Sequence, residues 1–141
     1  MNHDSALESF RRQLQVEPDN PGLRRRYWIQ LSRIYGQQGL ELLYDAKKWS
    51  QGPILAQDAV IGRLALQIES DYQWLDTQFH SCQELSFRIA AFRHIKTGIV
   101  THLIPGGLFV MGTEGGDANE RPAHEVQIKP FFMGQLAVTQ G

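Results

Sequence analysis

Apolar residues in the first part of the chain recur at the three- and four-residue spacing of amphipathic helices. Leu7, Phe10 and Leu14 fall on one stripe, which predicts a first helix ending at about Val16. Pro18 interrupts this pattern, because a proline inside a helix removes a backbone donor and clashes with the preceding turn. The pattern therefore predicts that a second helix starts only after this break.

Three further helices are predicted before residue 70. The second begins at Asn20-Pro21, where an N-cap residue precedes a proline, and it ends in a turn bracketed by Gly36 and Gly39. A third, short helix is marked by Leu40, Leu43 and Tyr44 and is expected to end near Trp49, and a fourth follows it. The fourth helix is expected to bury Ile54, Ile61, Leu64, Ala65 and Ile68 and to expose Gln57, Asp58, Arg63 and Gln67.

From about Phe87 the spacing of apolar residues changes to two, which is typical of strands. A hairpin at residues 96–98 is expected to return the chain as a partner strand over residues 99–104. Pro105-Gly106-Gly107 predicts a bend after that strand. Further extended runs are predicted at residues 108–111 and 126–132.

Helices therefore come first along the chain and strands second, without the alternation of a parallel β-α-β sheet. This order predicts an α+β fold. We expect a helical region over residues 1–70, a connecting segment over residues 71–86 and a second domain over residues 87–141.

Composition and charge narrow the possible functions. Hydrophobic residues make up 42% of the chain and charged residues 21%, which is ordinary globular usage. The formal net charge of -1 gives no general attraction to nucleic acid or to an anionic membrane, and neither partner is expected. Without a signal-peptide pattern, a membrane span or a cysteine beyond Cys82, the sequence predicts a cytoplasmic protein.

The candidate metal and catalytic motifs are all incomplete. His124-Glu125 begins like the zinc motif HExxH, but Ile128 stands at the second histidine position and the surroundings indicate a strand. His80 and Cys82 supply only two ligands. His94 and His102 flank the hairpin: a two-residue Thr97-Gly98 loop would oppose Arg93 to His102 and separate the two histidines, whereas a three-residue loop would bring them together.

Two other groups of residues have ordinary structural explanations. Glu114, Asp117 and Glu120 do not follow a calcium-loop pattern and are expected in a solvated loop. Arg24-Arg25-Arg26 lies beside Tyr27 and Trp28, but on a helix these arginines are expected to fan over the exposed face. No catalytic, cofactor-binding or metal residue is therefore assigned from the sequence.

A series of motifs between Arg93 and Gln140 resembles the opening of the formylglycine-generating-enzyme-like, or sulfatase-modifying factor, domain. The motifs occur in the family's order within the final third of the chain. They are R-H-x-x-T-G from Arg93, L-I-P-G-G-x-F-x-M-G from Leu103, E-x-P-x-H-x-V-x-I from Glu120, the pair Pro130-Phe131, and V-T-Q from Val138.

The resemblance implies an irregular fold of the C-type-lectin kind and, in complete catalytic relatives, a copper-dependent oxidase that converts a sulfatase cysteine to formylglycine. The family's catalytic cysteine pair lies near the end of the domain, so Cys82, which precedes the domain, is not carried over as either member. Related iron enzymes of ergothioneine synthesis use histidines from N-terminal helices. The helices expected here contain none after His3, which argues against that branch.

The predicted function is that of a fragment of a sulfatase-modifying-factor-like protein, inactive alone and without its own copper, so its status as an enzyme is left open. Its expected partner is the remainder of the domain or another protein. The alternative is a non-catalytic protein-interaction module whose helical region binds a partner. Ala6, Phe10 and Pro18 give that region a distant likeness to a tetratricopeptide repeat.

Overall fold

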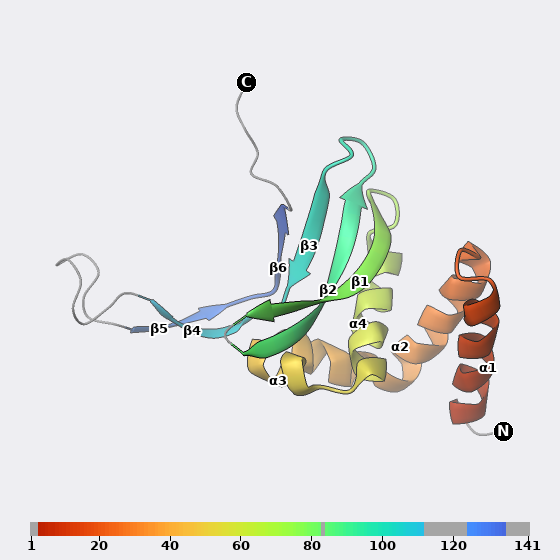
Figure 1. Ribbon diagram of the computed structural model, residues 1–141, viewed down its shortest axis with the longest axis horizontal. Coiled ribbons are helices and arrows are strands. Elements are labelled where there is room, and N and C mark those ends of the chain that lie inside the picture. Colours follow the sequence, from red (N-terminus) through yellow and green to blue (C-terminus); the bar gives the residue numbers. More distant parts are fainter. Residues whose placement is uncertain (1–2, 83, 112–123, 135–141) are drawn as a thin grey trace.

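The computed structural model of the chain describes residues 3–82, 84–111 and 124–134. Within these residues, helices precede strands, which confirms the α+β fold class (Figure 1). The elements are α1 (His3–Val16), α2 (Pro21–Leu43), α3 (Ala46–Gln51), α4 (Ile54–Gln67), β1 (Tyr72–Cys82), β2 (Leu85–His94), β3 (Val100–Ile104), β4 (Gly107–Met111), β5 (His124–Ile128) and β6 (Phe131–Gly134).

The helix α2 runs without interruption to Leu43, so the turn predicted between Gly36 and Gly39 is wrong. Both glycines are buried in the helix, and Gly39 lies directly against α4. A Cβ atom on Gly39 would lie 2.1 Å from the carbonyl oxygen of Ala56. Gly39 therefore serves close packing of two helix backbones rather than a chain reversal.

The third helix also differs from the prediction, because α3 begins only at Ala46. Asp45 is its N-cap, and the Asp45 side chain accepts a hydrogen bond from the backbone N–H of Lys48. This carboxylate satisfies one of the N–H groups that have no partner within the first turn of a helix. The short helix ends at Gln51, two residues beyond the buried Trp49.

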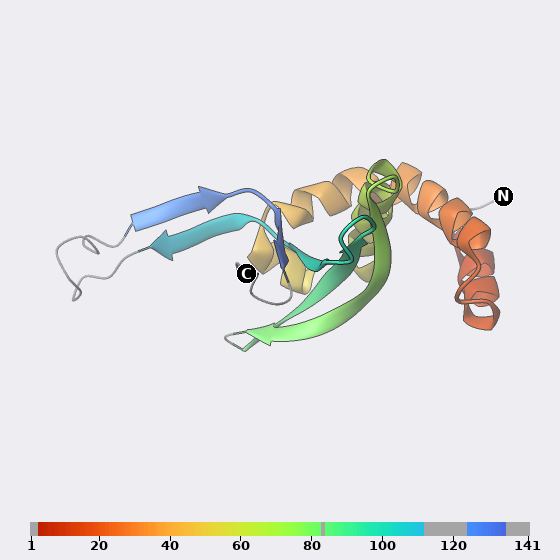
Figure 2. The ribbon, with the colours of Figure 1, turned by 90° about the horizontal axis from the view of Figure 1, so that it is seen from above.

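Four of the strands form one antiparallel sheet in the order β1-β2-β3-β6. The helices α3 and α4 lie against one face of this sheet, whereas α1 packs against α2 (Figures 1 and 2). Phe92, Leu103 and Phe132 point from the sheet into a core that also contains Trp49 and Ile61 from the helices. The sheet therefore shares one hydrophobic core with the helices, and a second cluster joins α1, α2 and α4.

The strand β1 occupies most of the stretch that was expected to connect the two parts of the chain. It pairs with β2 from Tyr72 opposite His94 to Cys82 opposite Leu85. The register shifts between Trp74 and Asp76, where a β-bulge adds one residue to β1. A bulge interrupts the period-two pattern of a strand, so the alternation does not run unbroken through β1.

The β2–β3 hairpin has neither of the two registers considered from the sequence. Arg93 pairs with Val100, and Ala91 pairs with His102. The turn between the strands is closed by a hydrogen bond from the backbone N–H of Gly98 to the carbonyl of His94. Gly98 has a φ of 75°, which glycine adopts without strain.

The strands β4 and β5 form a separate two-stranded arm that projects away from the helices (Figure 2). Its base is fixed at Gly106, whose N–H donates to the carbonyl of Leu43 and whose carbonyl accepts from the N–H of Ala46. The predicted bend at residues 105–107 is thus confirmed, since it redirects the chain from the main sheet into the arm. Leu108 on the arm is 65% exposed.

The arm should open far more readily than the main sheet. An isolated two-stranded ribbon is at best marginally stable in water, whereas β2 lies between two other strands and over the core. In native-state hydrogen exchange, we expect the amides of β4 and β5 to exchange orders of magnitude faster than those of β2. Equal protection of the arm and β2 would contradict this view of the arm as an independent ribbon.

Candidate functional site

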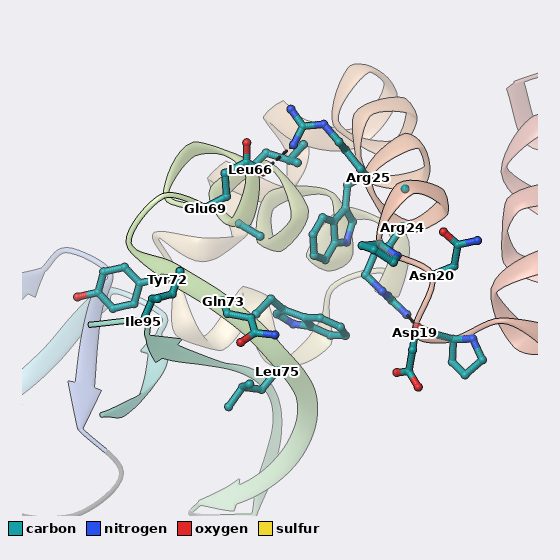
Figure 3. A pocket seen from close by; sticks show the side chains of 16 residues that line it. Asp19, Asn20, Arg24, Arg25, Leu66, Glu69, Tyr72, Gln73, Leu75 and Ile95 are labelled. Atoms are coloured by element: carbon teal, nitrogen blue, oxygen red, sulfur yellow. Dashed lines mark hydrogen bonds and ion pairs between the residues drawn. The ribbon is translucent and has the colours of Figure 1, made fainter. Parts of the chain in front are cut away.

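An open cleft of about 770 Å³ lies where the helices meet the first strand (Figure 3). Four regions line it: the α1–α2 loop with the first turns of α2, the end of α4 with the turn that follows it, the start of β1, and Ile95 just after β2. Its volume falls within the usual range for ligand sites in proteins. No residue of this cleft was assigned a function from the sequence.

Two tryptophans form the inner wall of the cleft. The rings of Trp28 and Trp74 meet edge to face, with centroids 5.5 Å apart. Trp28 occupies space left by Gly62 on α4, where a Cβ atom would lie 2.3 Å from the indole. The Nε1 of Trp74 donates a hydrogen bond to Thr77 Oγ1 over 3.1 Å. Packing and hydrogen bonding therefore fix both indoles before any ligand arrives.

Arg24 lies against this wall. Its guanidinium carbon is 4.6 Å from the ring centroid of Trp74 and 5.8 Å from that of Trp28, which is within the range of a cation–π interaction. Its Nη2 donates to the carbonyl of Pro18 over 2.9 Å. The sequence-based expectation that all three arginines of this helix are exposed is wrong for Arg24, which is half-buried.

The two arginines that line the cleft differ in their partners. Arg25 Nη1 lies 2.6 Å from Glu69 Oε2, on the rim of the cleft. Within the described part of the chain, no carboxylate oxygen lies within 4.0 Å of the Arg24 guanidinium. Burial lowers the pKa of Arg24, and the more distant Asp58 and Asp19 only partly oppose that effect. Arg24 is therefore a partly desolvated cation that has no ion-pair partner among the described residues.

A second polar cluster joins α3, α4 and β2 beneath the sheet. Arg88 Nη2 lies 2.8 Å from Asp58 Oδ1, and Arg88 Nη1 donates to Gln57 Oε1 over 3.0 Å. Gln57 Nε2 donates to the carbonyl of Trp49, and the indole N–H of Trp49 donates to the carbonyl of Arg88. We name Trp49, Gln57, Asp58 and Arg88 the polar lock.

The polar lock corrects the predicted faces of α4. Gln57 is only 3% exposed and Asp58 is half-buried, because Arg88 and Trp49 offer them partners that the sequence could not reveal. Ile54, predicted to be buried, is 53% exposed. Burial raises the pKa of Asp58, and the charge of Arg88 opposes this rise. The polar lock is structural, since its donors and acceptors are used on one another.

The structure brings together a different pair of histidines from the pair considered in the sequence. The rings of His80 and His102 lie 5.4 Å apart, whereas His94 Nδ1 lies 2.8 Å from Thr97 Oγ1. No group of three potential metal ligands occurs among residues 3–82, 84–111 and 124–134. The two histidines are thus neighbours on the sheet without a described third ligand.

The remaining sequence candidates contribute little to a site in the described residues. His124 and Glu125 lie on β5, which confirms the strand that argued against a zinc motif. Glu114, Asp117 and Glu120 lie outside the described residues. None of the described helices combines the length and apolar character needed to cross a bilayer.

Part of the cleft had a signal in the sequence. Arg24 and Trp28 are four residues apart on a helix, so their side chains share one face. Trp74 lies beside the β-bulge, in the segment that was expected to connect the two parts of the chain. The cation and one indole could therefore be paired from spacing, whereas the second indole is supplied by a strand far away in the sequence.

The described residues thus define an α+β protein with a preformed aromatic and cationic cleft at the junction of its helices and sheet. Residues 91–141 match the family model of the sulfatase-modifying factor enzyme 1-like domain. This match confirms the resemblance for that part of the chain, which is sulfatase-modifying-factor-like. Searches of the curated proteins and of the solved structures gave no match.

Proposed function

We propose that the helices and the β1–β2 hairpin form a platform on which a sulfatase-modifying-factor-like domain is built. The observation that carries this proposal is the continuity of the sheet across residue 91, where the family match begins. β3 and β6 of the matched part pair into the same sheet as β1 and β2. Phe132 and Leu103 from the matched part pack in the core with Trp49.

We further propose that these 141 residues do not oxidise cysteine by themselves. The chemistry of the catalytic relatives requires a pair of cysteines, and the sequence contains only Cys82. Cys82 lies at the end of β1, outside the residues that match the family. The copper, the remainder of the domain or a separate protein partner, and the cytoplasmic location stay predictions of the resemblance and the composition.

A direct assay tests the lack of oxidase activity. The purified chain is incubated with Cu(I), oxygen and a sulfatase-derived cysteine peptide, and formylglycine is measured by mass spectrometry. We expect no product above the level of the protein-free reaction, while a complete catalytic enzyme converts the same peptide. Catalytic turnover by the chain, abolished by Cys82→Ser, would refute the proposal.

A second candidate function is binding of a protein partner through the helical half. The specific observation in its favour is the cleft beside α2, where Trp28, Trp74 and Arg24 are held in place without a ligand. Preformed aromatic surfaces with an arginine are common anchors in protein recognition. This candidate is compatible with the platform proposal, because the cleft lies apart from the matched residues except at Ile95.

A further inference from the structure

The cleft has two chemically different ends. Arg24 and Asp19 lie at one end, and Tyr72 and Ile95 lie at the other (Figure 3). The Trp28–Trp74 wall adjoins Arg24, and Leu66 and Leu75 add apolar surface. A ligand that fills the cleft must therefore offer an anion to one end and apolar surface to the rest.

The position of Arg24 leaves most of its N–H donors available within the described part of the chain. The guanidinium carbon lies over the Trp74 ring, and one N–H, at Nη2, donates to the carbonyl of Pro18. A guanidinium has five N–H donors in its plane, which suit the two oxygens of a carboxylate. The fixed indole also limits the rotamer freedom that Arg24 would otherwise lose on binding.

The charges around the cleft favour a single carboxylate over a polyanion. Arg25 is already paired with Glu69, and Asp19 adds a second negative charge on the rim. The lining thus carries two arginines and two carboxylates, and only Arg24 has no close anion among the described residues. Repulsion from the rim carboxylates would oppose a chain of phosphates.

We propose that the cleft binds a peptide segment in which an acidic side chain stands next to an aromatic or aliphatic one. Arg24 receives the carboxylate, and Trp28 and Trp74 contact the neighbouring apolar side chain. The open form of the cleft lets the peptide backbone pass on toward Tyr72 and Ile95. This inference gives the second candidate function a ligand class and does not depend on the result of the oxidation assay.

The test is a titration of the full, ¹⁵N-labelled chain followed by NMR. The probe is an acetylated and amidated tripeptide of leucine, aspartate and phenylalanine, and the matched probe contains asparagine instead of aspartate. We expect the indole N–H signals of Trp28 and Trp74 to shift, with at least about tenfold tighter binding of the aspartate peptide, since hydrogen bonds to charged groups are the stronger ones. Equal binding of the two peptides, or binding of neither at 10 mM, would overturn the proposal.

Variants assign the preference to one side chain. Arg24→Gln should abolish the difference between the two peptides, whereas Arg26→Gln should preserve it, because Arg26 is exposed on the same helix and does not line the cleft. If Arg24→Gln fails to fold in a thermal scan, Arg24→Lys replaces it, and it should reduce the preference several-fold by removing the planar fork. A preference that survives in the folded Arg24 variant contradicts the assignment.

A third probe distinguishes the peptide from nucleic acid, which also uses arginine and stacked aromatic side chains. A short oligothymidine is titrated under the same conditions. We expect it to bind more weakly than the aspartate peptide because of Asp19 and Glu69 on the rim. Tighter binding of the oligothymidine would overturn the peptide proposal in favour of a single-stranded nucleic acid.

Discussion

Replacing Arg88 by methionine should destabilise the protein by about 3–5 kcal/mol at neutral pH, the usual cost of removing one partner of a buried ion pair. The Arg88 and Asp58 side chains are only 15% and 25% exposed, and Arg88 also donates to Gln57. Methionine keeps much of the apolar stem of arginine but leaves a carboxylate and an amide oxygen without their partner. Urea denaturation measures the loss, and Arg93→Met, on the exposed part of the same strand, should change stability by less than about 0.5 kcal/mol.

The loss caused by Arg88→Met should depend on pH in a defined direction. The pKa of Asp58 is already raised by burial, and removal of Arg88 takes away the charge that opposes this rise. A carboxyl group whose pKa is higher in the folded state contributes stability below its unfolded pKa, and this contribution is lost as the pH rises through the folded pKa. The Arg88→Met penalty should therefore shrink as the pH is lowered from 7 toward 4.

The double variant Asp58→Asn with Arg88→Met provides the control. Without a carboxylate to desolvate, the double variant should be more stable than Arg88→Met alone at pH 7, and the difference should fade in acid. If the losses caused by Asp58→Asn alone and by Arg88→Met alone added up to the loss of the double variant at every pH, Arg88 and Asp58 would not interact.

The second large effect is expected for Gly39→Ala, which should destabilise the protein by at least about 2 kcal/mol through overpacking. Alanine normally stabilises a helix by up to about 1 kcal/mol relative to glycine, so the expected sign is opposite to that of helix propensity. The reason is the 2.1 Å separation between the new Cβ atom and the Ala56 carbonyl oxygen, which belongs to the backbone of α4 and cannot rotate away. Thermal unfolding with a two-state fit measures the difference.

Gly22→Ala is the matched control in the same helix. Its Cβ atom would find Asn20 Oδ1 as nearest neighbour at 3.6 Å, which is an ordinary contact. We expect no loss of stability and a gain of up to about 1 kcal/mol. If both alanine variants were stabilised, the close approach of α2 and α4 at Gly39 would be contradicted.

The order of helices and strands could be predicted from the chain because it depends on local spacing. The end of α1 near Val16, the start of α2 at Pro21 and the strand character of residues around Val126 follow from stripes, caps and alternation. The errors arose where tertiary contacts override local signals. Glycine is common in turns, but Gly39 continues α2. It is a glycine because a Cβ atom at this position would collide with the backbone of α4.

Much of the candidate site depends on pairings between distant segments. Gln57 and Asp58 are polar residues of the kind expected on the exposed face of a helix. Their burial becomes favourable only because Arg88 on β2 donates a hydrogen bond to Gln57 and pairs with Asp58. Trp74 joins Trp28 because a bulge sets the register of β1. Local periodicity contains no information about either partner, whereas the motifs from Arg93 onward could be recognised because they occur in a fixed order.

The stacking of Tyr72 on Phe132 has a consequence for how the chain folds. Their rings lie 5.4 Å apart and nearly parallel, joining the first strand of the main sheet to its last. The helices consist of local contacts, but this contact closes a long loop and adds to the entropic barrier of folding. On a ribosome, α1 to α4 could associate early, whereas the aromatic stack must wait until Phe132 has left the exit tunnel.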